Sequence, residues 1–344
     1  MANRRLKVGL IGTGHIGRLH AEDLARRIPN ADLLAVADVF VDAAKRCAER
    51  LGIPRAVADY HAILEDREMD AVVVCSPSDT HGQIIVEAAA VGKHVFCEKP
   101  IDYHLAKIDA ALAAVDQAGV KLQIGFHRRF DPNFRRVKQA IEQSEIGQPM
   151  LLHIISRDPA PPPIDYVKTY LQHGGSLFLD MMIHDFDMAR FLVGSEVEEI
   201  YALGGLPVSA QTAELGDLDT AVVTLRFANG VIATIDNCRR AVYGYDQRLE
   251  MFGSGGSISV GNNFPNAAIL SNGERISRDL PLHFFTERYV EAYTAEIQAF
   301  VDAILDGWPV QVTGQDGRAP VVMALAAQKS VQERRPVRLS EVDG

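Results

Sequence analysis

The chain has 344 residues, more than the roughly 250 to 300 at which a single hydrophobic core stops growing, so its length predicts two domains. With 47% hydrophobic and 23% charged residues it is an ordinary globular chain, which excludes a disordered or fibrous protein. A net charge of -10 without any block of Lys or Arg argues against nucleic acid as a partner, because phosphate binding needs concentrated positive surface.

The N-terminus does not have the pattern of a signal peptide. Basic residues precede an apolar run, but the run ends at Gly12 and Gly14 without a small-residue cleavage site, so we expect a strand there. No run of 18 apolar residues occurs, and we expect no membrane span. The four cysteines form no C-x-x-C pair, which removes the usual zinc arrangement and any disulfide framework. Reduced thiols suit a cytoplasmic protein.

Residues 1–125 alternate short apolar runs with segments of helical period. The runs are continuous, as in strands buried on both faces, and they cover residues 6–12, 33–38, 71–76, 93–98 and 121–126. The amphipathic segments between them have the length of crossover helices. This alternation predicts an α/β fold with a doubly wound parallel sheet, a Rossmann dinucleotide-binding domain.

Residues 126–344 follow a different pattern. Two alternating runs flank Asn229-Gly230, the strongest short-range signal for a hairpin, and two more follow around a Gly pair at 255–256. One apolar helix is expected over 176–193, and two C-terminal helices near 285–306 and 317–333. We predict an α+β domain with a large, mainly antiparallel mixed sheet, whose C-terminal helix can pack back on the first domain. The proline-rich segment 158–165 predicts a stiff exposed loop.

Three glycines directly after the first strand predict a dinucleotide site. In Gly12-Thr-Gly14-His-Ile-Gly17, Gly12 makes the tight turn, Gly14 lets a pyrophosphate approach the backbone, and Gly17 lets helix and strand pack closely. The start of the helix supplies N–H groups for the phosphates. The alternative is a strand-turn-helix with a structural role only.

Asp38 ends the second run, where an acidic residue binds the adenosine ribose hydroxyls. It repels a 2′-phosphate, and the next residues, Val39 and Phe40, are not basic, so the sequence favours NAD over NADP. The alternative is an Asp that caps the following helix and leaves the choice of cofactor open.

Lys99 directly follows the carboxyl end of a predicted strand, and ligands of doubly wound folds bind at the carboxyl ends of the strands. Glu98 is able to hold its ammonium group and Pro100 to fix the backbone, which would let Lys99 donate a hydrogen bond to a substrate oxygen. A lysine that simply faces solvent after a strand is the alternative.

Asp180 and His184 have the i, i+4 spacing that places two side chains on one face of a helix. The carboxylate can orient the imidazole, whose ordinary pKa near ~6.5 suits a general base. The alternative is a buried histidine with satisfied hydrogen bonds. His184-x-x-Asp187 also permits a metal site, but two or three ligands from one helix are too few, so we expect no metal.

Arg128 and Arg129 follow the last run of the first half. At the end of a strand they are able to hold the cofactor or a polar substrate, or to form a salt bridge between the domains.

Together these motifs resemble the glucose-fructose oxidoreductase and inositol dehydrogenase (Gfo/Idh/MocA) family over nearly the whole chain. The resemblance rests on six segments, GTGHIG (12–17), CEKP (97–100), GFHRRFD (125–131), SRDP (156–159), DMMIHDFDMARF (180–191) and YGYDQR (243–248). The match is closest to members that oxidise myo-inositol at its 2-hydroxyl.

The resemblance implies roles for individual residues. Lys99 hydrogen-bonds the reacting hydroxyl, His184 removes its proton, and Asp180 orients both the histidine and the substrate. The substrate set adds Arg128, Asp158 and Tyr245. The cofactor set comprises Gly12, Gly14, His15, Ile16, Gly17, Asp38, Ser76, Pro77, His81, Glu98, Lys99 and Arg128. A cis Lys99-Pro100 peptide is also implied.

The resulting hypothesis is an enzyme that uses NAD to oxidise a secondary hydroxyl of a cyclic polyol to a ketone, with myo-inositol giving 2-keto-myo-inositol (scyllo-inosose). Another inositol isomer, scyllo or D-chiro, or an aldose such as glucose is the alternative substrate, and a non-catalytic NAD-binding sensor is the alternative class. The hypothesis requires Lys99 and the Asp180–His184 pair to meet at one carbon atom. The family resemblance further implies inositol catabolism and a homo-oligomer, a tetramer by analogy.

Overall fold

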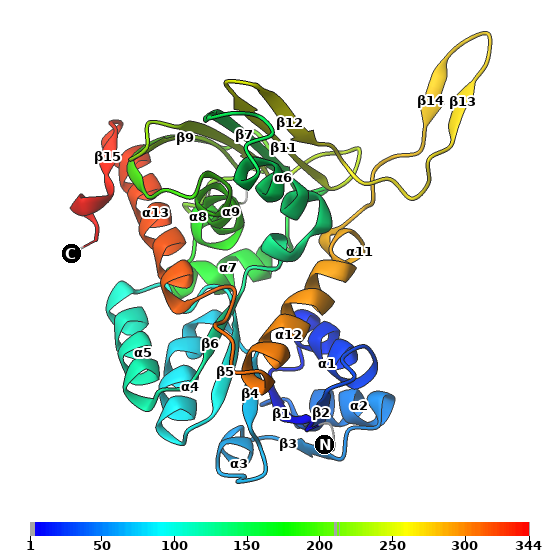
Figure 1. Cartoon of the computed structure of the whole chain (residues 1–344), viewed down its shortest axis with the longest axis vertical. Coiled ribbons are helices and arrows are strands. Elements are labelled where there is room, and N and C mark those ends of the chain that lie inside the picture. The colour runs from blue at the N-terminus through cyan, green and yellow to red at the C-terminus, as the bar shows by residue number, and fades with distance from the viewer. Residues whose placement is uncertain (1–3, 210–211, 213, 344) are drawn as a thin grey trace. The chain divides into compact units, whose positions relative to one another are not determined.

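The computed structural model describes residues 4–209, 212 and 214–343. The chain forms two compact units, one from Met1–Phe130 with Glu291–Ala319 and the other from Asp131–Val290 with Pro320–Gly344 (Figure 1). Among the described residues, no helix has both the length and the apolar character that crossing a membrane requires.

The first unit is built on a six-stranded parallel sheet in the order β3-β2-β1-β4-β5-β6. Its strands are β1 (Leu6–Ile11), β2 (Ala31–Ala37), β3 (Arg55–Val57), β4 (Ala71–Val74), β5 (His94–Glu98) and β6 (Leu122–Gly125). Five of these were predicted. The sixth, β3, has only three residues, none of them buried, so no apolar run marks it. The strand order reverses between β1 and β4, and ligands of such sheets bind at that switch point.

Helices cover this sheet and complete its core. They are α1 (His15–Arg26), α2 (Val41–Leu51), α3 (His61–Leu64), α4 (Ser78–Ala90) and α5 (Leu105–Ala118), with the short 3-10 helix η1 (His127–Phe130) after β6. Helix α12 (Val290–Leu305) comes from far along the chain, yet its Ile297, Phe300 and Val301 belong to the buried cluster around β1 and β2. The packing of α12 thus adds a late segment to the dinucleotide-binding fold.

The second unit is built on a seven-stranded sheet in the order β12-β11-β7-β10-β9-β8-β15. Among its described strands, β7 and β10 are the one neighbouring pair that runs parallel. Its strands are β7 (Pro149–Arg157), β8 (Val197–Gly205), β9 (Thr220–Phe227), β10 (Ile232–Cys238), β11 (Asp246–Gly253), β12 (Gly256–Val260) and β15 (Val337–Arg338). The hairpin predicted at Asn229-Gly230 joins β9 to β10, with Gly230 at φ +87°. The mixed, mainly antiparallel sheet is confirmed.

The remaining elements are α6 (Pro132–Glu142), α7 (Ile164–Gln172), α8 (Leu177–Asp180), α9 (Ile183–Val193), α11 (Phe285–Arg288), α13 (Gly314–Glu333), η2 (Leu339–Glu341) and a two-stranded hairpin of β13 (Ile269–Ser271) and β14 (Ile276–Arg278). This hairpin stands away from the seven-stranded sheet (Figure 1).

Two predicted helices are interrupted. The helix expected over 176–193 is wrong as a single element, since a turn at Met181 and Met182 separates α8 from α9. The N–H of Met182 bonds the carbonyl of Leu177, five residues back, and this wider turn ends the regular ladder. The helix expected over 285–306 is likewise split at Tyr289 into α11 and α12.

Side chains alternate between the two faces of the seven-stranded sheet. In β9, Ala221, Val223 and Leu225 are buried, while Val222 and Thr224 between them are exposed. The buried face supports the helices of the unit. The opposite face is open and carries the large exposed apolar side chains Leu151, Tyr201, Leu203, Val222, Ile232 and Phe252.

Candidate active site

The glycine turn after β1 combines two glycines that the fold needs with one that it does not. Gly12 has φ +93°, and a Cβ there would lie 2.6 Å from the backbone of Cys75 and Ser76. A Cβ on Gly17 would lie 1.8 Å from the carbonyl oxygen of Gly12. At Gly14, the residue before α1, a Cβ would meet no described atom within 4 Å. Packing therefore does not explain this glycine, whereas a pyrophosphate at the start of the helix does.

Asp38 is held at the end of β2 by the turn itself. Its Oδ2 accepts hydrogen bonds from the backbone N–H of Thr13 at 2.7 Å and from the Thr13 hydroxyl at 2.8 Å, and its Oδ1 accepts the N–H of Phe40 at 2.9 Å. It does not cap α2, whose first turn has no side-chain cap. A carboxylate has about four acceptor positions, so capacity for a ribose hydroxyl remains. The residues fit NAD.

The turn that follows β5 is fastened from both sides. On one side the Glu98 carboxylate accepts a hydrogen bond from His20 Nε2 at 2.7 Å. On the other, the ring of His81 lies with Nδ1 2.8 Å from the Pro100 carbonyl oxygen and Nε2 2.8 Å from that of Ser76. Burial lowers the pKa of His81, while its two carbonyl contacts act in the opposite direction. His81 thus links the turn after β4 to the turn that carries Lys99.

The peptide bond between Lys99 and Pro100 is cis, as the resemblance implied. Lys99 is half-buried and comes directly after the buried Glu98 at the carboxyl end of β5.

The other residues of the predicted cofactor set lie at the carboxyl ends of the parallel strands or at the helices that follow. His15 and Ile16 open α1, Ser76 and Pro77 precede α4, and Arg128 is buried in η1. Arg129 forms an ion pair at 3.0 Å with Asp316, which belongs to the same unit.

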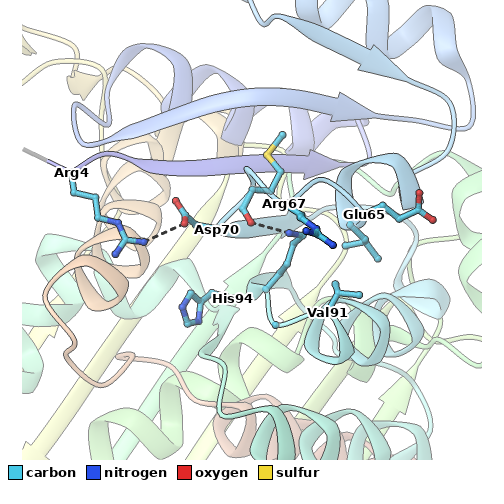
Figure 2. Close-up of a pocket in the computed structure, with 10 residues that line it drawn as sticks. Arg4, Glu65, Arg67, Asp70, Val91 and His94 are labelled. Atoms are coloured by element: carbon cyan, nitrogen blue, oxygen red, sulfur yellow. Dashed lines mark hydrogen bonds and ion pairs between the residues drawn. The ribbon is translucent and has the colours of Figure 1, made fainter.

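The hollow drawn in Figure 2 lies at the amino ends of the strands of the six-stranded sheet, opposite to the carboxyl ends where the predicted cofactor residues lie. Its volume is about 480 Å³, and its lining includes Arg4, Asp70 and His94, at or just before the starts of β1, β4 and β5. Arg4 pairs there with Asp70 at 3.2 Å. Because dinucleotides bind at the carboxyl ends of the strands, this hollow is not the cofactor site.

In the second unit, Asp180 ends α8 and His184 lies in the first turn of α9. The Asp180 carboxylate accepts a hydrogen bond from the hydroxyl of Tyr166 at 2.9 Å and one from Arg239 at 3.0 Å. These contacts fix the carboxylate where α8 ends. The part that Asp180 plays toward His184 stays a prediction.

Arg239, which the sequence analysis did not single out, is a partner of the predicted site residue Asp180. It follows β10, is almost fully buried, and bonds both Asp180 and, at 3.2 Å, the hydroxyl of Tyr170. Burial opposes its charge, but Asp180, Tyr170 and Asp158 raise the pKa of Arg239 above its ordinary value. A buried guanidinium paired with a carboxylate provides polar groups suited to a hydroxylated ligand. Its sequence signal is a charged residue at the end of an alternating strand.

Asp158 and Tyr245 lie close to the same end of the sheet. Strands β7 and β11 pair Arg157 with Asp246, so Asp158 and Tyr245 come one residue beyond that pair. The Tyr245 ring packs edge-on against Tyr289, with ring centroids 6.0 Å apart.

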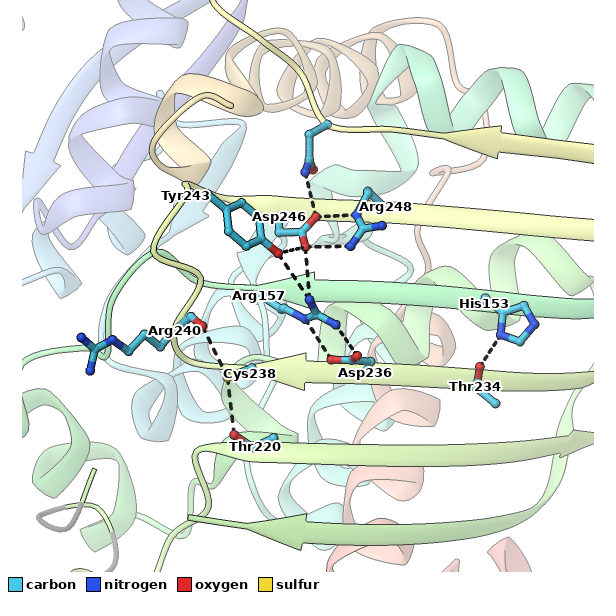
Figure 3. A network of polar contacts seen from close by, with 11 residues as sticks. His153, Arg157, Thr220, Thr234, Asp236, Cys238, Arg240, Tyr243, Asp246 and Arg248 are labelled. Carbon is cyan, nitrogen blue, oxygen red and sulfur yellow. Dashed lines mark hydrogen bonds and ion pairs between the residues drawn. The ribbon is translucent and has the colours of Figure 1, made fainter. Parts of the chain in front are cut away.

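A polar network holds this end of the sheet from the open face (Figure 3). Arg157 pairs with Asp236 at 2.5 Å and contacts the hydroxyl of Tyr243 at 3.3 Å. Asp246 accepts hydrogen bonds from Tyr243 at 2.5 Å and from Arg248 at 2.7 Å. Burial opposes ionisation, but the hydrogen bonds from Arg248 and Tyr243 lower the pKa of Asp246. The hydrogen bonds within the YGYDQR segment (243–248) therefore hold the residues on both sides of Tyr245 in place.

The fold and these two sets of side chains define a class: a dehydrogenase with a dinucleotide-binding Rossmann unit and a second unit rich in buried polar groups. Residues 6–126 match the family model described as "Oxidoreductase family, NAD-binding Rossmann fold", and residues 134–259 match "GFO/IDH/MocA C-terminal domain". The chain belongs to the Gfo/Idh/MocA oxidoreductase family, and the resemblance predicted from its motifs is confirmed.

Several relatives resemble the chain over its whole length. It is 46% identical over 341 residues to the myo-inositol 2-dehydrogenase of Thermotoga maritima, covering 98% of this chain and 100% of that one. It is 42% identical to the inositol 2-dehydrogenase of Rhizobium meliloti, covering 97% and 99%. The solved structure of scyllo-inositol dehydrogenase from Lactobacillus casei, with NAD(H) and scyllo-inositol bound, is similar with a TM-score of 0.92 at 32% identity, covering 98% and 100%.

Proposed function

We propose that this protein oxidises myo-inositol to 2-keto-myo-inositol (scyllo-inosose) with NAD+. The carrying observation is the 46% identity, over 98% of the chain, to a myo-inositol 2-dehydrogenase. The polar groups of the second unit support it, because Asp158, Asp180 and Arg239 offer several donors and acceptors to a polyhydroxylated ring.

In the proposed mechanism the protein supplies position and a base. Lys99 donates a hydrogen bond to the oxygen of the reacting hydroxyl, and His184 takes its proton. Asp180, fixed by Tyr166 and Arg239, orients the histidine and the substrate. NAD+, when bound, supplies the hydride acceptor.

The remaining predicted residues have binding roles. Arg128, Asp158 and Tyr245 bind the other hydroxyls of the substrate. The cofactor is bound by Gly12, Gly14, His15, Ile16, Gly17, Asp38, Ser76, Pro77, His81, Glu98, Lys99 and Arg128. Because Asp38 repels a 2′-phosphate and the next side chains are Val39 and Phe40, we expect a preference for NAD+ over NADP+.

The decisive experiment measures initial rates with NAD+ and NADP+ across the inositol isomers and common aldoses. We expect myo-inositol with NAD+ to have the highest kcat/KM. If D-glucose is oxidised faster than every inositol, the substrate assignment is wrong while the polyol chemistry stands. If NAD+ binds but nothing in the panel is oxidised, the chain is a sensor.

A second substrate has a specific observation in its favour, namely the similarity to a scyllo-inositol dehydrogenase. The two isomers differ in whether the hydroxyl at position 2 is axial or equatorial, so the same panel separates them.

We also infer a homo-oligomer, with a tetramer expected from the family resemblance. The open face of the seven-stranded sheet exposes Leu203 beside Val222, and Leu151 beside both Ile232 and Phe252. Two exposed apolar groups on one open face suit burial against a second copy. Light scattering of the wild type and of Val222→Asp tests this, and a monomeric wild type would contradict it. Reduced cysteines and use of NAD favour a cytoplasmic enzyme of inositol catabolism.

A further inference from the structure

Three ionisable side chains from distant parts of the sequence meet inside the first unit. His20 comes from α1, Glu98 from the end of β5 and Glu296 from α12. His20 Nε2 lies 2.7 Å from Glu98 Oε1 and 3.9 Å from Glu296 Oε1. The side chains of His20 and Glu296 have no exposed surface, and that of Glu98 is 11% exposed.

The surroundings of this cluster are aromatic and acidic. The rings of Phe96 and Tyr293 pack edge-on against His20, with centroids 5.3 and 5.7 Å away. Gly125 leaves room for the carboxylate of Glu98, since a Cβ there would lie 3.1 Å from it. The charged groups that act on Glu296 are Glu98 itself and Asp23 of α1, both acids.

Two cysteine thiols lie on or next to the neighbouring strands, Cys75 directly after β4 and Cys97 in β5. Burial raises the pKa of both thiols well above the usual range, and Glu98 adds to the effect. They are therefore neutral at physiological pH, and the cluster gains no compensating positive charge from β4 or β5.

Glu296 lacks donors for its charge. In the described part of the chain, neither of its carboxyl oxygens has a hydrogen-bond partner, and the same holds for His20 Nδ1. Gln123 lies alongside but donates its Nε2–H to the Glu296 backbone carbonyl at 2.8 Å. An ionised carboxylate buried without a donor is very unfavourable. Burial, followed by Glu98 and Asp23, raises the pKa of Glu296 well above its ordinary value.

A metal ion would also bind such a set of groups, but the distances favour a proton. Two ligands of a tetrahedral zinc ion, each about 2.0 to 2.1 Å from the metal, lie about 3.3 Å apart. The 2.7 Å separation of His20 Nε2 and Glu98 Oε1 is shorter and is that of a charge-assisted hydrogen bond.

We propose that Glu296 stays protonated in the folded enzyme at neutral pH and that His20, Glu98 and Glu296 form a buried positioning triad for Lys99. Because Glu296 carries a proton, two carboxyl groups can lie close together in this buried site without both being charged. Glu98 remains the acceptor of the His20 N–H, and that bond fixes the peptide before Lys99. The other side of the turn is held by His81 at the Pro100 carbonyl. The positioning part rests on the proposed polyol oxidation, whereas the protonation part does not.

The proton is tested directly by infrared spectroscopy on the purified enzyme, comparing wild type with Glu296→Gln. We expect the wild type at pH 8 to show the carbonyl stretch of a protonated carboxylic acid, and Glu296→Gln to lack it. Because glutamine copies the neutral acid, the variant should unfold at a higher temperature than wild type at pH 8. An absent acid band, or a variant less stable than wild type at pH 8, overturns the protonated state.

Metal analysis of the same samples decides whether the three side chains bind a metal ion in place of the proton. One equivalent of a divalent ion, retained by the wild type and lost in Glu296→Gln, would replace the proton by a metal and overturn the proposal. We expect no stoichiometric ion, and no change in activity or melting temperature on adding a chelator.

The positioning role is tested at His20 with two variants. His20→Leu removes the donor to Glu98 and should lower kcat about tenfold, less than the roughly 10²-fold that a misplacement of about 1 Å can cost, with the Kd for NAD+ within twofold. His20→Gln keeps an N–H at the end of the side chain and should restore most of the loss. Equal kcat for His20→Leu and wild type overturns positioning. So does a His20→Gln variant that folds but is as slow as His20→Leu.

The readouts separate this inference from the proposed function. If no polyol is oxidised by wild type, the proposed function fails, and the infrared band and the stability of Glu296→Gln still decide the state of the triad.

Discussion

Replacing Gly14 with alanine decides whether the turn after β1 serves a ligand or only the fold. Gly14 has φ -64° and ψ -160°, extended backbone that alanine also adopts, and a Cβ there meets no described atom within 4 Å. We therefore expect the free energy of unfolding to change by less than about 1 kcal/mol.

The expected effect on cofactor binding is much larger. The N–H groups at the start of α1 are the donors available to a pyrophosphate, and a methyl group on Gly14 would hold that anion away from the backbone. A hydrogen bond to a charged group contributes about 1.5 to 3 kcal/mol. Losing one such bond weakens NAD+ binding by about 10- to 100-fold, because about 1.4 kcal/mol corresponds to a factor of ten.

Isothermal titration of NAD+ into Gly14→Ala, with thermal unfolding of the same sample, measures both quantities. Gly52→Ala is the matched control: Gly52 caps α2 at φ +71°, and a Cβ there also meets no described atom. It should lose about 1 to 2 kcal/mol of stability through backbone strain and keep the Kd for NAD+. Wild-type affinity in Gly14→Ala would refute the reasoning and leave the turn a purely structural element.

Four further predictions concern single side chains. His184→Ala should lower kcat by about 10² to 10⁴ with little change in the Kd for NAD+, and unchanged steady-state turnover of every oxidisable polyol would remove His184 from the role of base. Asp38→Ala should reduce the ratio of kcat/KM for NAD+ to that for NADP+, and a constant ratio would show that Asp38 does not select the cofactor. Arg239→Met removes the buried partner of Asp180 and should lower the free energy of unfolding in urea by about 3 kcal/mol; a loss below about 1 kcal/mol would mean the pair is not needed. The pKa of Glu296 is raised in the folded state, so the stability that this group contributes is complete below its ordinary pKa of 4.5 and is lost as pH rises above that value. The stability of Glu296→Gln relative to wild type should therefore increase by up to about 1.4 kcal/mol per pH unit from pH 5 to 8. A flat or opposite trend in unfolding titrations would contradict this.

The elements of the first unit were predictable wherever a local pattern marks them. Continuous apolar runs locate five of the six parallel strands, and the glycine spacing locates the turn that Gly12 makes at φ +93°. The Asn229-Gly230 pair locates the hairpin between β9 and β10 in the same way. Strand β3 and the turn at Met181 and Met182 escaped because a three-residue exposed strand and a break inside an apolar helix leave no periodic signal.

The sequence by itself determined the class of protein, because the residues that form the dinucleotide turn are neighbours in the chain and act through local backbone geometry. It also marked Lys99, Asp180 and His184, since each lies in a short motif. Only the tertiary structure decided that Arg239 bonds Asp180 and that His20 and Glu296, 276 positions apart, meet beside Glu98. Periodicity and propensity act over a few residues, whereas the pairing of buried charges depends on how distant helices pack against a sheet.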